Sequence, residues 1–164
     1  MGPRSETVRP DYRSITEQSQ EKDLIHKSAS AQWSGGLEDG SGTIATESGA
    51  LTGIPYSYTK RFEGETGSNP EELVGAAHAA CFAMFLSALM GGAGLTGTSV
   101  SAKSTISMDP ATEGSPTITA AHLTVAVKAD APEATVRELA EKAKQGCPVS
   151  KLLKAEITME LTVG

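Results

Sequence analysis

The two cysteines of the chain, Cys81 and Cys147, stand in different sequence contexts. Cys81 lies in the middle of an apolar, alanine-rich run, where burial raises the pKa of a thiol and leaves it unreactive unless a positive charge lies close by. Cys147 directly precedes Pro148, a residue type favoured at the first position of a helix, and a helix N-terminus stabilises a thiolate. This asymmetry fits a pair of redox thiols, of which one is oxidised to a sulfenic acid and the other condenses with it to a disulfide.

Each of these residues also has an interpretation without redox chemistry. A free cysteine in an apolar run is more often a buried packing residue, and Cys147 fits a plain helix cap. The chain adds His26, His78 and His122 as potential zinc ligands, but it has no C-x-x-C or H-x-x-x-H spacing, so we expect no metal and no cofactor. His78 lies one helical turn before Cys81 and is placed to tune the thiol, although a packed and hydrogen-bonded histidine is the simpler interpretation.

The composition limits the partners of the chain. Its 164 residues suit a single domain, and the formal net charge of −6 makes nucleic acid and anionic membranes poor partners. Aromatic residues make up only 4% of the chain, while alanine and glycine fill many positions where bulky side chains are expected. We therefore expect the core to be completed by packing against a second copy of the chain.

No segment resembles a signal peptide or a membrane span. Met1–Leu24 is polar and charged, and the longest apolar run, Gly75–Met90, is interrupted by His78 and Ser87 and is too short to cross a bilayer. We therefore expect a cytoplasmic protein. The reducing cytosol disfavours structural disulfides, so two cysteines there favour a catalytic or redox role.

The clearest structural signal is a helix start at Asn69-Pro70-Glu71-Glu72. It has a favoured N-cap, a proline at the first helical position and two acids at the positive end of the helix dipole. The helix is predicted to run to Gly91-Gly92, and because it is apolar on nearly all sides it is predicted to be buried. Met1–Leu24 has no periodicity and is predicted to be a flexible extension, which leaves 25–164 as the folded domain.

Alternating and periodic patterns predict the other elements. The strands are expected at Ala29–Trp33, Gly42–Ser48, Pro55–Phe62, Val100–Met108, Ala121–Val127 and Ile157–Val163, with an amphipathic helix at Pro132–Gln145 and a short helical turn at Cys147–Ser150. The resulting order is β-β-β-α-β-β-α-β. Strands come in runs rather than alternating singly with helices, which is typical of the α+β class.

Three separated motifs are more specific than any of these patterns. They are Arg61-Phe62-Glu63-Gly64, Asn69-Pro-Glu-Glu-Leu-Val-Gly-Ala-Ala-His-Ala-Ala-Cys81-Phe82, and Gly146-Cys147-Pro148-Val149-Ser150 with Leu152-Leu153. Together they resemble the OsmC/Ohr family of organic hydroperoxide reductases, and the resemblance covers Ile25–Gly164 in the right order. His78 and the sequence Glu156-Ile157-Thr158 resemble the OsmC branch more than the Ohr branch.

The resemblance implies a fold, an activity and a set of site residues. The fold is an intertwined homodimer with long central helices packed against β-sheets and active sites at the subunit interface. Cys81 matches the peroxidatic cysteine, Cys147 the resolving cysteine, Arg61 the arginine that activates the thiol and Glu71 the acid that holds the arginine. Members of the family reduce organic hydroperoxides better than hydrogen peroxide, and some are recycled by lipoylated proteins or other dithiols.

Physical chemistry agrees with these roles. The Arg61 guanidinium is charged at every relevant pH and can supply the positive partner that Cys81 needs, while a carboxylate such as Glu71 can fix its planar fork. The attack of a thiolate on an O–O bond expels an alkoxide that also needs stabilising. Apolar side chains of the same helix, Phe82 and Phe85, are expected to line the substrate pocket.

Two other function classes stay open. The chain can be a non-catalytic stress protein that binds a hydrophobic ligand in an apolar interface pocket, or a structural protein with a static disulfide. Without the resemblance, Arg61 is a plain exposed charge on an edge strand and Glu71 simply complements the helix dipole.

Helix geometry limits how the site residues can meet. Glu71 and Cys81 are ten positions apart, so they lie about 15 Å apart along a straight helix and on different faces. Either Gly75 kinks the helix, or Glu71 serves the active site of the partner subunit. An alanine-rich helix that needs a close neighbour favours the second arrangement, a homodimer with composite active sites.

Overall fold

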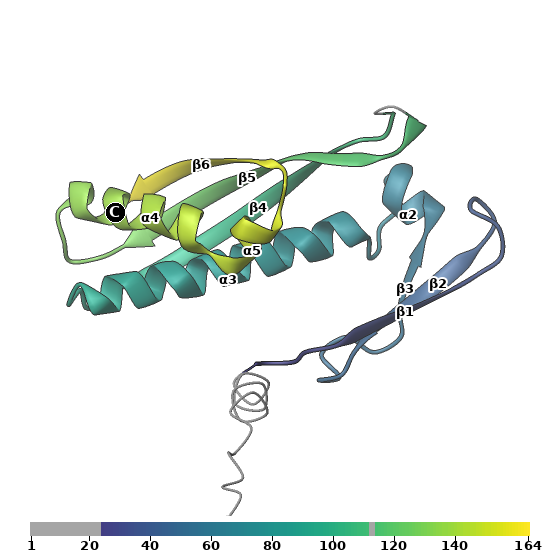
Figure 1. Ribbon diagram of the computed structural model, residues 1–164, viewed down its shortest axis with the longest axis horizontal. Helices are drawn as coiled ribbons and strands as arrows, with labels where there is room; N and C mark the ends of the chain where they lie inside the picture. The colour runs from purple at the N-terminus through teal and green to yellow at the C-terminus, as the bar shows by residue number, and fades with distance from the viewer. Residues whose placement is uncertain (1–23, 112–113) are drawn as a thin grey trace, which may run out of the picture.

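The computed structural model describes residues 24–111 and 114–164. The predicted flexible extension, Met1–Leu24, lies outside the described residues except for Leu24 itself. The described chain forms two three-stranded sheets joined by helices, which confirms the α+β class. In Figure 1 the first sheet stands to one side of a larger body that contains the second sheet and the long helix.

The first sheet has the order β1-β2-β3 and is antiparallel throughout. Its strands are β1 (Ala29–Ser34), β2 (Ser41–Thr46) and β3 (Ile54–Ser57). Every residue of β1 is exposed, although apolar and polar residues alternate along it as in a half-buried strand. The face of this sheet that the sequence pattern marks as apolar therefore has no cover from the rest of the chain described here.

The predicted strand Pro55–Phe62 is wrong over its second half, because the chain turns into the short helix α2 (Tyr58–Phe62) after β3. Ser57 adopts an extended backbone and its hydroxyl accepts a hydrogen bond from the Lys60 amide, which caps the helix. Alternation of side chains alone did not reveal this cap. As a result Arg61 lies on a helix and not on an edge strand.

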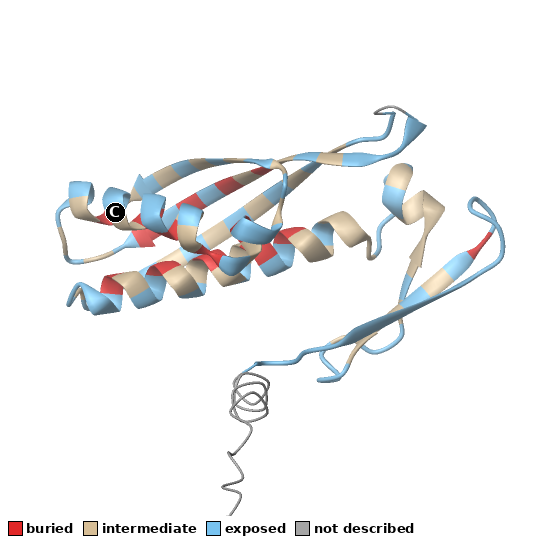
Figure 2. Cartoon of the chain, in the orientation of Figure 1, coloured by how far each residue is buried: buried red, intermediate tan, exposed pale blue. Residues whose placement is uncertain are grey.

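The second sheet has the order β4-β5-β6, in which β4 (Ser99–Asp109) and β5 (Thr117–Lys128) are antiparallel. The last strand, β6 (Glu156–Val163), pairs with β5 in the parallel sense. A parallel neighbour needs a crossover, and α4 (Glu133–Gly146) and α5 (Pro148–Leu152) supply it. Because β5 buries every second residue, one face of the sheet packs against the helices and the other is open (Figure 2).

The long helix, α3 (Pro70–Gly92), begins and ends where the sequence predicts. The Asn69 side chain accepts a hydrogen bond from the Glu72 amide, as an N-cap residue does. The helix runs through Gly75 without interruption. The prediction that α3 is buried holds only for one stripe within the single chain, because that stripe packs on the sheet while Met84 on another side is 75% exposed.

The apolar run Gly75–Met90 was expected to be too short to cross a bilayer. This expectation is wrong, because the run is part of α3, and the length and composition of α3 do not exclude it from a bilayer. Among the residues that the structure describes, its 23 residues make it the one helix long and apolar enough to do so. The core helix of a soluble protein passes the same test. In this chain the buried stripe of α3 packs against β4, α4 and α5, as such a core helix does.

The core lies between α3, α4 and the inner face of the second sheet (Figure 2). The largest fully buried apolar side chains are Phe82, Leu86 and Met90 from α3, Leu123, Val125 and Val127 from β5, and Val136 from α4. Burial at roughly 25 cal/mol per Å² of apolar surface makes this interface the main source of stability in the described chain. It also holds the middle of α3, where Cys81 lies.

Gly75 is a point of close approach between α3 and β4, and this contact leads to a stability prediction. A Cβ atom at this position would lie 2.8 Å from the Ser104 carbonyl oxygen, which belongs to the backbone and cannot rotate away. We expect Gly75→Ala to lower the free energy of unfolding by about 1–3 kcal/mol, as overpacking does. Urea unfolding followed by circular dichroism measures this change.

The matched control is Gly91→Ala, in the last turn of the same helix. No atom lies within 4 Å of a Cβ at that position, so the helix propensity of alanine should raise stability by up to about 1 kcal/mol. Equal effects of the two substitutions would show that close packing of α3 on β4 does not limit the residue at position 75.

Candidate active site

The structure brings the two cysteines together. The sulfur atoms of Cys81 and Cys147 share a hydrogen bond 3.0 Å long, and both residues are free thiols. Cys81 lies in the middle of α3, and Cys147 lies between α4 and α5, 66 positions further along the chain. A disulfide bond is about 2.05 Å long, so a movement of about 1 Å between the sulfurs is enough to form one.

The turn before Cys147 depends on Gly146. A Cβ atom there would lie 2.6 Å from the Phe85 ring on α3, so a larger residue at this position would have to displace that ring. Pro148 then begins α5, as the sequence predicts. The position of the Cys147 sulfur beside Cys81 therefore follows from a glycine and a proline on either side of it.

The two thiols differ in their exposure to solvent. Cys147 is completely buried, whereas Cys81 is only partly buried and so is the thiol that a substrate can reach. Burial raises the pKa of Cys81, and the hydrogen bond with Cys147 raises that pKa further. In the chain described here, Cys81 is therefore a protonated thiol without a positive partner.

The Cys147 thiol ionises more easily despite its burial. Burial opposes its ionisation, but hydrogen bonds from Cys81 and from the backbone and side chain of Ser150 hold the pKa of Cys147 below its usual value. Cys147 makes no regular capping hydrogen bond to α5, so these contacts and the nearby Val149 amide carry the effect. The sequence-based expectation of a stabilised thiolate at position 147 agrees in direction.

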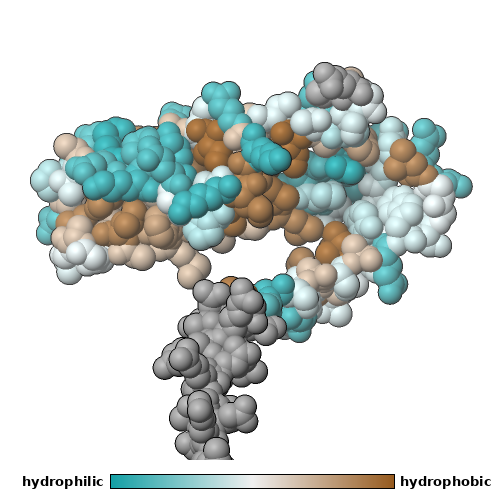
Figure 3. Space-filling model, in the orientation of Figure 1, coloured by the Kyte–Doolittle hydropathy of each residue, from teal (hydrophilic) through white to brown (hydrophobic). Residues whose placement is uncertain are grey.

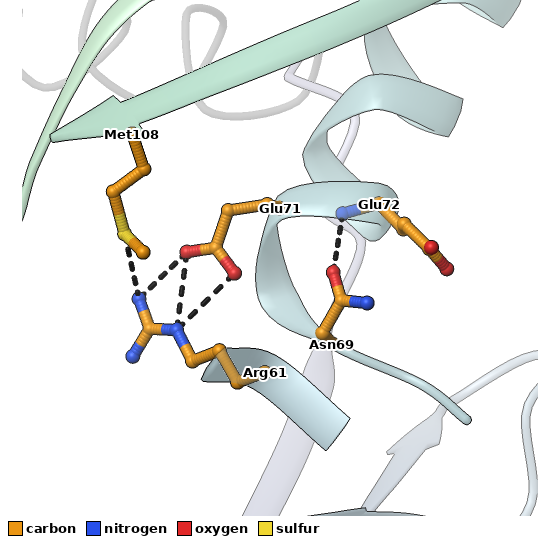
Figure 4. Close-up of polar contacts among 5 residues, drawn as sticks. All are labelled: Arg61, Asn69, Glu71, Glu72 and Met108. Carbon is orange, nitrogen blue, oxygen red and sulfur yellow. Dashed lines mark hydrogen bonds and ion pairs between the residues drawn. The ribbon is translucent and has the colours of Figure 1, made fainter. Parts of the chain in front are cut away.

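The other two predicted site residues form a second pair (Figure 4). The Arg61 Nη2 atom donates to Glu71 Oε1 at 2.6 Å, and Nε lies 3.1 Å from both carboxylate oxygens. Nη2 also donates to the Met108 sulfur at 3.7 Å, and the guanidinium carbon lies 5.0 Å from the centre of the Phe62 ring. A carboxylate, a sulfur atom and an aromatic ring thus fix the guanidinium plane.

The two pairs are separate within one chain. Glu71 lies at the beginning of α3 and Cys81 ten positions further along an unbroken helix, which separates them by about 15 Å along its axis. Arg61 is held at the Glu71 end. The structure therefore brings together Cys81 with Cys147 and Arg61 with Glu71, but it does not bring the arginine to the cysteine.

A cavity of about 260 Å³ lies beside Arg61. It is lined mainly by aromatic and apolar side chains from the first sheet and α2, among them Trp33, Leu37, Tyr56, Tyr58 and Phe62. Phe82, which was expected to line the substrate pocket, is instead fully buried in the core. The cavity beside the arginine therefore touches the Cys81 helix only at its first residue, Pro70.

His78 is packed and hydrogen-bonded, which is the simpler of its two predicted roles. It is completely buried, with Nδ1 2.9 Å from the Ser104 hydroxyl and Nε2 2.9 Å from the Ser150 hydroxyl. Burial lowers the pKa of His78, so its imidazole is neutral at neutral pH. Sequence reasoning missed both serines, although Ser104 is a polar residue among the inward-facing positions of β4 and so carried a signal.

Metal binding has no support in the described residues. Within 24–111 and 114–164, no group of three or more His, Cys, Asp or Glu side chains is placed to hold an ion. His122, for example, makes a 2.7 Å hydrogen bond to the Thr158 hydroxyl.

Residues 63–162 match the family model described as "OsmC-like protein". Over 137 residues the chain is 48% identical to proteins called "Peroxiredoxin OsmC" from Escherichia coli K12 and Shigella flexneri, covering 83% of this chain and 95% of each relative. The segment matched by the family model contains Glu71, Cys81 and Cys147.

Solved structures of similar fold carry related descriptions. An organic hydroperoxide resistance protein from Elizabethkingia anophelis, with thiocyanate bound, is 26% identical with a TM-score of 0.61 and covers 87% of this chain and 98% of its own. A second such protein from Vibrio cholerae, described as putative and with captopril in one active site, is 25% identical with a TM-score of 0.61, covering 86% and 93%. OhrB of Bacillus subtilis, at 23% identity and a TM-score of 0.56, supports the fold alone, with 84% and 98% covered.

Proposed function

The chain is a peroxidase of the OsmC-like family, and we propose that it reduces organic hydroperoxides to alcohols through Cys81 and Cys147. The observation that carries the proposal is the 3.0 Å contact between an accessible and a buried thiol. The Cys81 thiolate attacks the outer peroxide oxygen, becomes a sulfenic acid and releases an alkoxide that takes up a proton. Cys147 then attacks the Cys81 sulfur, which forms the disulfide and releases water.

Cys81 is assigned the first step because of access. Cys147 has the lower pKa, but it is completely buried, whereas Cys81 is partly exposed and is the thiol that a peroxide can contact. The lowered pKa of Cys147 suits the second step instead, since a resolving cysteine must attack as a thiolate. Domain 25–164 carries all of these residues.

The Arg61–Glu71 pair is proposed to activate Cys81 of a partner subunit. Cys81 needs a positive charge to ionise, and the only arginine that the family motif supplies is held at the other end of α3 in its own chain. A second copy of the chain that packs along α3 can bring its arginine to the cysteine. The protein is therefore proposed to be a homodimer with two composite active sites.

The surface of α3 supports this assembly. Ala83, Met84, Ser87 and Ala88, with Val100 of β4, line a shallow hollow of about 510 Å³ on the helix face that does not pack on the sheet. Figure 3 shows patches of hydrophobic surface in the region of α3. Burial of this face in a dimer removes apolar surface from water, which is favourable at roughly 25 cal/mol per Å².

The cavity beside Arg61 supports a bulky organic substrate. The aromatic walls of about 260 Å³ can take up an alkyl or aryl group while the guanidinium contacts the peroxide oxygens. Within the described residues the Arg61 Nη1 atom has no hydrogen-bond partner, so one edge of the fork remains for the substrate (Figure 4). A dithiol or a lipoylated protein is proposed to reduce the disulfide again in the cytoplasm, with no nucleic acid or membrane as partner.

Steady-state turnover tests this function. With dithiothreitol as reductant, we expect a catalytic efficiency for cumene hydroperoxide at least about tenfold above that for hydrogen peroxide, because about 1.4 kcal/mol of extra apolar contact is enough for that ratio. Cys81→Ser should abolish peroxide consumption. A Cys81→Ser protein that still turns over, or equal efficiency for both peroxides, contradicts the assignment of the cysteine or of the substrate class.

Subunit complementation tests the composite site. Cys81→Ser and Arg61→Ala proteins should each be inactive, but heterodimers formed by mixing them should contain one site with both Cys81 and Arg61 intact. We expect mixtures at equal concentration to regain up to about a quarter of wild-type activity, because half of the dimers are heterodimers and each has one working site of two.

The control is a mixture of the Cys81→Ser and Glu133→Ala proteins. Glu133 lies on the exposed face of α4 far from the site, so the Glu133→Ala protein should be active alone. Native mass spectrometry must show subunit exchange in both mixtures. Exchange without recovered activity in the first mixture would place Arg61 and Cys81 of one site in the same chain.

A further inference from the structure

Two pairs of side chains join α5 to α3, one helical turn apart. The Cys81 and Cys147 sulfur atoms lie 3.0 Å apart, and His78 Nε2 lies 2.9 Å from the Ser150 hydroxyl. His78 precedes Cys81 by three positions on α3, and Ser150 follows Cys147 by three positions in α5. Residues three apart are neighbours on one face of a helix, so the two pairs fix α5 against α3 at two adjacent points.

The strand β4 holds the His78 ring from its other side. His78 Nδ1 lies 2.9 Å from the Ser104 hydroxyl. One turn earlier on α3, Gly75 is so close to the same strand that a Cβ atom would lie 2.8 Å from the Ser104 carbonyl oxygen. The backbone of α3 and the His78 side chain are therefore both fixed on β4, and the ring contacts α5 from a rigid support.

The helix α5 depends on such a support because it is short. It has five residues, and the Lys151 amide donates to the Cys147 carbonyl oxygen at 3.0 Å. A helix of this length is not stable by itself in water. Val149 is partly buried against the core, but apolar contacts are not directional, whereas a hydrogen bond fixes the two atoms that it joins.

The burial of His78 and Ser150 argues against a role in packing alone. His78 is completely buried and Ser150 is 6% exposed, and both ring nitrogens and the Ser150 hydroxyl are paired. An apolar side chain at position 78 would fill the same stripe of α3, next to Phe82, without needing these partners. A fully paired polar group in a core specifies one arrangement of its neighbours, which here are β4, α3 and α5.

We propose that His78 is a positioning residue for disulfide formation: through its hydrogen bond to Ser150 it holds α5 where the Cys147 sulfur meets the Cys81 sulfur. The inference rests on the proposed function, in which Cys147 resolves the sulfenic acid of Cys81. In this role His78 acts through Ser150 and α5 and takes no part in the bond changes themselves.

The step that His78 supports is the closure of the disulfide. The Cys147 thiolate attacks the sulfenic sulfur of Cys81, the S–S bond forms as the S–O bond breaks, and the leaving hydroxide takes up the proton that Cys147 released, so the products are a disulfide and water. The 3.0 Å contact is about 1 Å longer than a disulfide bond of about 2.05 Å. Because a misplacement of about 1 Å costs on the order of 100-fold in rate, a support that keeps α5 in place has a large effect on closure.

Single-turnover reactions separate closure from the first oxidation. The full chain is treated with one equivalent of cumene hydroperoxide, quenched with reagents that block thiols and trap sulfenic acid, and analysed by intact mass spectrometry over time. For Ser150→Ala we expect sulfenic acid to form at the wild-type rate and the disulfide to close about tenfold more slowly, which is the factor that one buried hydrogen bond contributes.

Two further measurements distinguish positioning from a general structural effect. A tenfold lower effective concentration of one thiol at the other raises the reduction potential of the Cys81–Cys147 disulfide by about 30 mV in Ser150→Ala. Closure is also followed as a function of pH up to the plateau where Cys147 is fully ionised. Loss of positioning lowers this plateau, whereas a changed pKa of Cys147 moves the midpoint and leaves the plateau unchanged.

Ser150→Thr tests the hydroxyl itself. It keeps the hydrogen-bonding group, and Ser150 borders a surface hollow of about 280 Å³ that has room for the added methyl group. We expect Ser150→Thr to have the closure rate and the potential of the wild type. The matched control is Ser101→Ala, a serine-to-alanine substitution on the exposed face of β4, which should change neither quantity.

A second variant keeps the test valid if Ser150→Ala does not fold. Ser104→Ala removes the hydroxyl that holds the His78 ring on β4, on a different element from both cysteines. We expect it to slow closure by about threefold or more, because the ring then loses one of its two hydrogen bonds. Thermal unfolding identifies the variants that are folded at the assay temperature.

The outcomes distinguish this inference from the function on which it rests. If the wild-type protein forms no Cys81–Cys147 disulfide, the proposed function is wrong and the inference falls with it. If the wild type closes this disulfide and the folded serine variants close it with the same plateau rate and potential, His78 does not position α5, while the peroxidase mechanism stands. Slow closure in Ser150→Ala that Ser150→Thr does not restore, or a shifted pH midpoint with an unchanged plateau, also overturns the inference.

Discussion

The 3.0 Å contact between the sulfur atoms of Cys81 and Cys147 is the constraint around which the larger body of the protein is arranged. One sulfur is carried by α3, which packs on the second sheet, and the other by the crossover between β5 and β6. Gly146 lets the crossover approach the helix, and Pro148 turns it away again into α5. Changes that move α3 relative to the crossover separate the two thiols.

The second constraint is electrostatic. Burial favours the neutral form of Cys81, and the chain's own Arg61 is locked onto Glu71 at the other end of α3. A single chain therefore holds a close pair of thiols without a nearby positive charge, and an arginine–glutamate pair without a nearby thiol. The exposed apolar hollow of α3 begins at Ala83, just beyond Cys81. We propose that a second chain packed along α3 completes both half-sites.

The sequence predicted most of the elements because their signals are local. The Asn69-Pro70 cap defined the start of α3, and alternation located β4, β5 and β6 to within a few residues. The wrong prediction of a strand where α2 lies also has a local cause. Ser57 caps a five-residue helix, which is too short to show a periodic pattern. The expected full burial of α3 failed because composition does not tell which face is covered within one chain.

The candidate site was likewise predictable from the sequence only in part. The contexts of Cys81 and Cys147 fitted a redox pair but also packing residues, and the family resemblance favoured the first interpretation and added Arg61 and Glu71, which the structure joins in an ion pair. The partners of His78 were not predictable, because Ser104 and Ser150 lie on β4 and α5 and meet the ring only through tertiary packing. Spacing along one helix gives no access to such contacts.

The most direct test of the account is to locate the disulfide that one turnover makes. The reduced protein is treated with one equivalent of cumene hydroperoxide, its free thiols are blocked, and the digested peptides are identified by mass spectrometry. The account predicts a single cross-link that joins Cys81 to Cys147 of the same chain, and a Cys147→Ser protein that stops at the sulfenic acid of Cys81. A disulfide between Cys81 residues of two chains, or sulfenic acid on Cys147 in the wild-type protein, would contradict it.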